Sequence, residues 1–258
     1  MTSTNRLTLN TLAELLRILR RGGSRLPLLL SVIVPVATAV LWALFISDTE
    51  GGDSSLAVTS PIQLAGFLAT LGASFSLTLN LAKSAESTAV TSLLVIRERH
   101  TVFWSILSGQ AAAASLPILL AGLITTPIAM VVNGTLDDLH DALTAFTASA
   151  VAGVLFSVLT LALGILVRKS VWVIVTHLFL VYISPLALMA SIVLPLPEFL
   201  TEHVLGAVER LPAALLIVAN TTGVTEGSHR PLIAMGGLAV WASVATLAAL
   251  RSFNRRDF

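Results

Sequence analysis

Residues 143–167 read LTAFTASAVAGVLFSVLTLALGILV and contain no charged side chain. A helix rises about 1.5 Å per residue, so this stretch exceeds the roughly 20 residues that cross a hydrocarbon core of about 30 Å. The composition of the chain agrees, with 55% apolar and 11% charged residues among 258 and a mean hydropathy of +0.91. Too little polar surface remains to cover a soluble globule, so the sequence predicts an all-α polytopic membrane protein.

Five other stretches resemble residues 143–167, which predicts six transmembrane helices in one domain over residues 1–258. None of the six contains Asp, Glu, Lys or Arg, and their approximate bounds are Pro27 to Ile46, Ile62 to Leu81, Val102 to Val132, Leu143 to Val167, Val171 to Leu194 and Pro231 to Leu250. Pro117 and Pro127 fall inside the third span, which is overlong, so we expect that helix to tilt or kink. Six crossings place both termini on one side of the membrane.

The charged residues are divided unevenly between the connections. Placing both termini and the second and fourth connections in the cytoplasm collects 13 of the 15 basic residues there: Arg6, Arg17, Arg20, Arg21, Arg25, Lys83, Arg97, Arg99, Arg168, Lys169, Arg251, Arg255 and Arg256. The other connections hold 10 of the 14 acidic residues: Asp48, Glu50, Asp53, Asp137, Asp138, Asp141, Glu198, Glu202, Glu209 and Glu226. Because Lys and Arg concentrate in cytoplasmic loops, the pattern predicts that both termini lie in the cytoplasm.

An amphipathic segment precedes the first span, within residues 1–25. Four leucines recur at the spacing of one helix face: Leu12, Leu15, Leu16 and Leu19. Arginines occupy the other faces, which predicts a helix lying in the membrane interface. We expect Thr11 and Glu14 to form a capping box at its start and Gly22 to follow its end. This helix either anchors the topology through anionic lipid or also contacts a cytoplasmic partner.

The connection of residues 195–230, between the last two predicted spans, is long and changes character along its length. Residues 197–210 are acidic and amphipathic, whereas the apolar stretch from Leu211 to Ala219 is about nine residues long and too short to cross. Two short re-entrant helices on the extracellular side fit both features, and an additional spanning helix is the alternative. Three glutamates form either an extracellular gate or a hydrated surface: Glu198, Glu202 and Glu209.

The predicted spans offer few polar groups. His177 is the one ionisable side chain well inside a span, and it is either hydrogen-bonded to a neighbouring helix or a contact for a transported molecule. Four uncharged residues are candidates for a substrate path, unless each bonds to its own helix backbone: Thr38, Ser74, Ser76 and Thr78. We expect no site for a coupling ion, because such sites commonly use charged side chains within a span.

No motif in the chain indicates an enzyme. The five histidines never form His-Glu-x-x-His, and the absence of cysteine removes thiolate nucleophiles and thiolate metal sites, so we expect no catalytic and no metal-binding residues. A Gly-x-x-x-x-Gly-Lys phosphate loop is impossible, because the only lysines, Lys83 and Lys169, follow Ala82 and Arg168. We therefore expect no cofactor in this chain, and ATP with Mg²⁺ on a separate subunit if transport is active.

The longest predicted cytoplasmic connection covers residues 82–101. A polar beginning is followed by a short apolar stretch and then by the charged cluster Arg97-Glu98-Arg99-His100. This order predicts a short helix parallel to the membrane whose charged cluster faces a soluble protein. The alternative is a positively charged cytoplasmic loop with local ion pairs.

The same region resembles a known family, the ABC-2 type permeases. Between their second and third spans, these proteins carry a glutamate, Gly-Thr, a leucine pair, Pro-x-Arg and Gly-Lys in this order. The matching residues here are Glu86, Thr91, Leu93, Leu94, Arg99 and Gly109. The chain departs from the pattern at Val90 and Gln110 and lacks the proline before Arg99. Family members are also similar in their amphipathic N-terminal helix, six spans and two short re-entrant helices.

The resemblance implies the permease half of an ATP-driven exporter in a bacterial cytoplasmic membrane. Such a permease pairs with an identical or related permease, and each of the two sits on an ABC ATPase subunit. Membrane lipid is a further expected partner, and nucleic acid is not. Four residues would then couple the permease to the ATPase: Glu86, Arg97, Glu98 and Arg99.

The substrate implied by the resemblance is hydrophobic or amphipathic and leaves the inner leaflet between the first and fifth spans of two protomers. The small size resembles permeases that confer immunity to lantibiotics and other antimicrobial peptides. Two other classes stay open, a membrane scaffold or sensor subunit and an intramembrane hydrolase.

Overall fold

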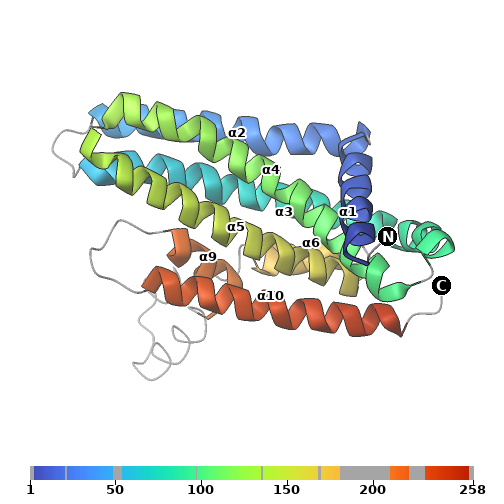
Figure 1. The fold of residues 1–258 in the computed structure, drawn as a ribbon. Helices are drawn as coiled ribbons and strands as arrows, with labels where there is room; N and C mark the ends of the chain where they lie inside the picture. Colours follow the sequence, from blue (N-terminus) through green and yellow to red (C-terminus); the bar gives the residue numbers. More distant parts are fainter. Residues whose placement is uncertain are drawn as a thin grey trace, which may run out of the picture.

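The computed structural model describes residues 3–20, 22–48, 54–96, 98–134, 136–167, 170–180, 210–220 and 230–255. Within these ranges the chain is almost entirely helical and contains no strand, in agreement with the predicted all-α class (Figure 1). The helices are α1 (Ser3–Arg20), α2 (Gly22–Asp48), α3 (Ser54–Ile96), α4 (Arg99–Asn133), the short 3-10 helix η1 (Leu136–Asp138), α5 (Leu139–Val167), α6 (Ser170–Leu178), α9 (Pro212–Asn220) and α10 (Arg230–Asn254).

Five helices among the described residues are long and apolar enough to cross a membrane. Their apolar segments are Arg25–Ile46, Ser55–Leu81, Arg99–Asn133, Leu139–Val167 and Arg230–Asn254, which coincide with five of the six predicted spans. The other predicted span, Val171 to Leu194, is described only as far as Leu180, through α6 and a short continuation, and residues 181–194 lie outside the described part. Five apolar helices make the chain a multi-pass membrane protein.

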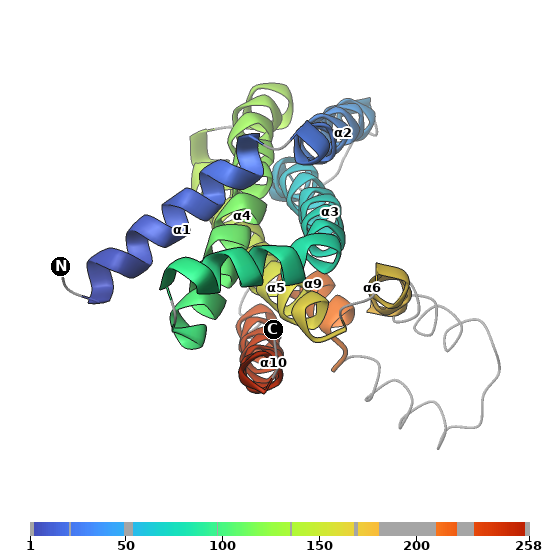
Figure 2. The ribbon, with the colours of Figure 1, turned by 90° about the vertical axis from the view of Figure 1, so that its right-hand side faces the viewer.

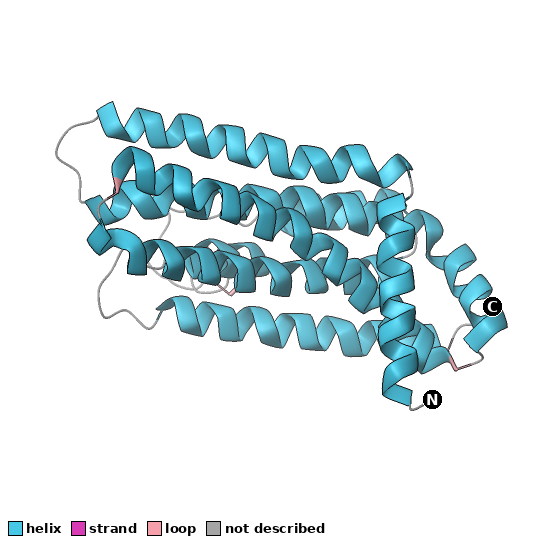
Figure 3. Cartoon of the chain, turned by 45° about the horizontal axis from the view of Figure 1, so that its top comes forward, coloured by secondary structure: helices cyan, strands magenta, loops and turns pink. Residues whose placement is uncertain are grey.

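Two helical segments lie across one end of the bundle. The long helices run side by side, and both chain termini lie at the same end (Figure 1). α1 crosses that end at a steep angle to the long helices (Figures 2 and 3). α3 continues beyond its apolar segment to Ile96, and this last part also runs across the end (Figure 2). The separate short helix predicted within residues 82–101 is therefore the continuation of α3.

The N-terminal helix is longer than predicted. α1 begins at Ser3, so Thr11 and Glu14 lie in its interior and the predicted capping box is wrong. The physical reason is that backbone amides in a helix interior are bonded within the helix and need no cap, and the carboxylate of Glu14 accepts hydrogen bonds from Arg17 at 2.7 and 2.8 Å instead. The predicted break before Gly22 is confirmed, since α1 ends at Arg20 and α2 begins at Gly22.

The central helix of the bundle is α3, which contacts α2, α4, α5, α6 and α9. Small residues bring α3 and α5 together. A Cβ on Gly66 would lie 2.7 Å from the Cβ of Ser149, and a Cβ on Gly164 would lie 2.7 Å from Cγ2 of Thr78. The order of these pairs shows that the two helices run parallel. Such close approach favours helix association in lipid, where burying apolar side chains adds little driving force.

We predict that Gly66→Ala lowers the thermal unfolding temperature of the detergent-purified protein. The added methyl group meets the Cβ of Ser149 rather than the flexible end of a side chain, so α3 and α5 must separate, which costs roughly 1–3 kcal/mol. Gly236→Ala is the matched control, because nothing lies within 4 Å of a Cβ there. Equal unfolding temperatures for the two variants would contradict the packing of α3 on α5.

Candidate functional site

The end of the bundle that carries both termini is rich in arginine. We call α1 together with residues 82–96 of α3 the end platform, because both segments lie across this end (Figure 2). Described arginines at this end come from four helices or their ends: Arg17, Arg20, Arg25, Arg99, Arg251 and Arg255. The opposite end carries acidic residues in η1 and the first turn of α5: Asp137, Asp138 and Asp141. The charge difference seen in the sequence therefore separates the two ends of the folded bundle.

Two of the four predicted coupling residues, Glu98 and Arg99, lie at this end and have described contacts. Arg99 begins α4 and donates from Nη1 to the carbonyl oxygen of Asn254 at 2.9 Å, which ties α4 to the end of α10. Glu98 precedes α4, is exposed, and accepts a hydrogen bond from the Thr101 hydroxyl at 2.9 Å. Glu86 belongs to α3, but its side chain lies outside the described part, as does the whole of Arg97.

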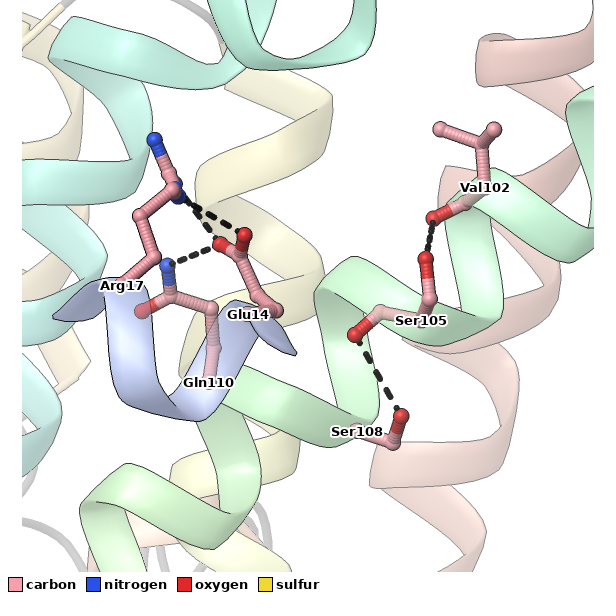
Figure 4. A network of polar contacts seen from close by, with 6 residues as sticks. All are labelled: Glu14, Arg17, Val102, Ser105, Ser108 and Gln110. Atoms are coloured by element: carbon pink, nitrogen blue, oxygen red, sulfur yellow. Dashed lines mark hydrogen bonds and ion pairs between the residues drawn. The ribbon is translucent and has the colours of Figure 1, made fainter. Parts of the chain in front are cut away.

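A buried carboxylate fastens the end platform to the bundle. Glu14 of α1 is 8% exposed and receives hydrogen bonds from Arg17 on its own helix and, at 3.4 Å, from Nε2 of Gln110 on α4 (Figure 4). The hydroxyl groups of Thr11 and Ser108 meet 2.8 Å apart across the same interface. We call these five residues the α1–α4 latch.

Gly109 makes the latch possible. A Cβ at this position would lie 2.7 Å from Cγ of Glu14 and 3.2 Å from the carbonyl oxygen of Thr11. Gly109 and its neighbour Gln110 are the positions that correspond to Gly-Lys in the permease pattern. The structure therefore gives both residues a role in seating α1, which the sequence pattern did not reveal. The spacing of Glu14 from Thr11 predicted a capping box, so the contact of Glu14 with α4 was not predicted.

The packed face of α1 differs from the predicted leucine face. Leu15 and Leu19 pack against the bundle, next to the buried Ile18. Leu12 and Leu16 are instead 51% and 42% exposed, because Glu14 and Thr11 occupy the interface with α4. Together with the exposed Leu9, these leucines form an apolar face that points away from the bundle.

A second polar feature runs along the contact of α3 with α5, and we call it the polar seam. Its members are uncharged side chains that are at most 6% exposed: Thr70, Ser74, Thr78, Ser149, Ser157, Thr160, His177 and Asn220. Asn220 of α9 accepts a hydrogen bond from Ser149 and donates to the carbonyl oxygen of Leu216 at 2.7 Å. α6 contributes His177, so four helices meet along the seam.

Three polar atoms of the seam lack a hydrogen-bond partner among the described residues: Thr78 Oγ1, Ser157 Oγ and His177 Nδ1. The His177 ring lies between aromatic side chains, with centroids 5.0 Å from Phe75 and 6.5 Å from Phe156. Thr78 and His177 line a cavity of about 10 Å³, close to the space that one water molecule occupies. A buried polar group without a partner is costly, so each of these atoms needs a hydrogen-bond partner beyond the described residues.

The structure brings together only part of the predicted substrate path. Ser74, Thr78 and His177 join the seam, although Ser74 donates to the carbonyl oxygen of its own helix at Leu71. Thr38 lies on α2 away from the seam and bonds to the carbonyl oxygen of Val34 at 2.9 Å, and Ser76 is half-buried. The predicted gate residues lie outside the described part of the chain: Glu198, Glu202 and Glu209.

We predict that Glu14→Ala loosens α1 without unfolding the bundle. The substitution leaves Gln110 buried without its partner and Arg17 without its counter-charge, so amide exchange across residues 3–20 accelerates roughly tenfold or more. Hydrogen exchange with mass spectrometry measures this effect, and Arg20→Ala is the control because Arg20 is exposed on the same helix. Identical exchange in the two variants would show that the latch does not hold α1.

Comparison with known proteins adds no support to the resemblance to ABC-2 type permeases. No family model matches the chain, and no curated protein matches it in sequence. The features that bear on function are therefore the apolar helices, the end platform, the latch and the polar seam.

Proposed function

We propose that this chain is the permease subunit of an ATP-driven exporter in a bacterial cytoplasmic membrane. The observation that carries the proposal is the end platform, two helical segments lying across the arginine-rich end of a membrane-crossing bundle. Arginine-rich ends face the cytoplasm, where ATP is available. A soluble ATPase that docks at this end would contact the two helical segments of the end platform along their length. Its ATP and Mg²⁺ remain on the ATPase subunit.

The connectivity of α3 supports transmission from the platform into the membrane. α3 is a single helix of 43 residues whose final part belongs to the platform and whose apolar part carries Thr70, Ser74 and Thr78. The latch joins the other platform helix, α1, to α4. A force applied at Glu86 would therefore reach the polar seam through one continuous helix. A force applied at Arg99 would pass along α4, which packs against α3 and α5.

A sixth crossing between α5 and α10 completes the proposed topology. α5 ends at the platform end, whereas α10 begins at the opposite end (Figure 1). The chain between Val167 and Arg230 must therefore travel the length of the bundle. α6 begins this path antiparallel to α5, because α6 starts at Ser170 just after α5 ends at Val167, while the ring of His177 lies 6.5 Å from that of Phe156, further back along α5. We assign the sixth crossing to Val171–Leu194, followed by a re-entrant segment that includes the nine-residue α9.

The proposed substrate is hydrophobic or amphipathic and passes between two protomers. α2 and α6 flank α3 on one side of the bundle (Figure 2), and both present large apolar side chains outward, including Val34, Leu41, Val171 and Trp172. We propose this side as the meeting surface with a second permease chain. The unpartnered polar atoms near His177 then supply contacts for the polar part of the substrate, and Glu198, Glu202 and Glu209 form the outer gate.

We predict that the tagged chain, purified from its native membranes, retains an ATPase subunit. Glu86→Ala and Arg99→Ala should leave this complex assembled while lowering its ATP hydrolysis on the order of tenfold, the size of a typical coupling between sites. Asp137→Ala serves as the control, since Asp137 is exposed at the opposite end of the bundle.

The proposal fails if no ATPase co-purifies, or if hydrolysis and substrate efflux survive both changes at the platform. A partner that binds the platform but hydrolyses no nucleotide would instead indicate a scaffold or sensor subunit.

A further inference from the structure

We propose that a groove at the elbow between α1 and α2 binds one anionic phospholipid from the leaflet next to the end platform. The groove has a volume of about 370 Å³ and lies between the end of α1, the beginning of α2 and the middle of α4. Its walls include Leu28, Leu29, Val32, Leu116 and Leu120, and Arg25 is the one charged residue among the described residues that line it. We call it the elbow groove.

The walls of the elbow groove suit a hydrocarbon chain. Apart from Arg25, every described residue that lines it is apolar, and its volume is far larger than the cavity of about 10 Å³ beside His177. Leu29, Leu116 and Leu120 are 57%, 37% and 47% exposed, so the groove opens sideways to the surroundings of the bundle. In a membrane, that direction faces lipid.

Arg25 places a positive charge at the level of the lipid headgroups. α1 lies across the end of the bundle and α2 runs along it, so the elbow between them marks the depth at which the chain enters hydrocarbon (Figure 2). Nε of Arg25 donates to the carbonyl oxygen of Leu19 at 2.9 Å, which fixes the guanidinium beside the last turn of α1. Among the described residues, its terminal nitrogens have no other partner and can bind phosphate oxygens.

The combination of one arginine and a long apolar wall favours a lipid over a soluble anion. A free phosphate would contact a single exposed arginine and leave the groove unfilled, whereas a phospholipid uses both features. The exposed apolar face of α1, formed by Leu9, Leu12 and Leu16, would lie in the same leaflet. The inference requires only that the chain spans a membrane, so it stands apart from ATP-driven export.

Native mass spectrometry of the full-length chain in detergent tests the proposal, with phosphatidylglycerol and phosphatidylcholine offered together. We expect one retained phosphatidylglycerol per chain. Arg25→Gln should lower the preference for phosphatidylglycerol about tenfold, because a charge-assisted contact is lost. Arg251→Gln removes an exposed arginine at the same end and should change the preference by less than about twofold.

A second pair of variants tests the walls. Leu116→Trp fills the groove and should weaken retention of both lipids, whereas Leu123→Trp, two turns along the same helix and outside the groove, should not. Equal losses of preference in Arg25→Gln and Arg251→Gln would overturn the site. Displacement of the lipid by inorganic phosphate at equal concentration would overturn it as well, since the apolar walls would then contribute nothing.

Discussion

The structure depends on the close approach of α3 to its neighbours. Within hydrocarbon, an apolar side chain gains little by exchanging lipid for protein, so helices associate through tight packing of small residues. Gly66 against Ser149 and Gly72 against Ser31 place α3 within van der Waals contact of α5 and α2. This packing also buries the hydroxyl groups of Thr70, Ser74 and Thr78, so the polar seam is a consequence of the same small residues that hold the bundle together.

The long helices were predictable because length and hydropathy determine them. Five predicted spans match helices, since no alternative satisfies backbone amides in hydrocarbon. Which side of each helix faces inward was not predictable, because α4 and α5 are apolar all round and carry no periodic signal. The seam was therefore found only in part: Ser74, Thr78 and His177 came from the sequence, whereas Ser149, Ser157 and Asn220 required the packing of α5 and α9.

The contacts of the charged residue Glu14 in the latch were likewise not predictable from the sequence. Glu14 lies three residues after Thr11 in a leucine-rich segment, and that spacing alone favours a cap. Only the crossing of α1 over α4 reveals that Gly109 leaves room for the carboxylate and that Gln110 reaches it. A central helix that runs into the platform and a carboxylate that fastens α1 to α4 together make the platform continuous with the membrane bundle. The permease proposal depends on this continuity.

The proposed mechanism requires the end platform to lie on the cytoplasmic side of the membrane, and the side that it occupies can be measured directly. The chain has no cysteine, so single-cysteine variants report accessibility without background. Asn254→Cys is exposed at the platform end and Asp137→Cys at the opposite end. In intact cells, a membrane-impermeant maleimide should label Asp137→Cys, and it should label Asn254→Cys only after permeabilisation. Labelling of Asn254→Cys from outside would place the platform away from cytoplasmic ATP and contradict the proposed mechanism.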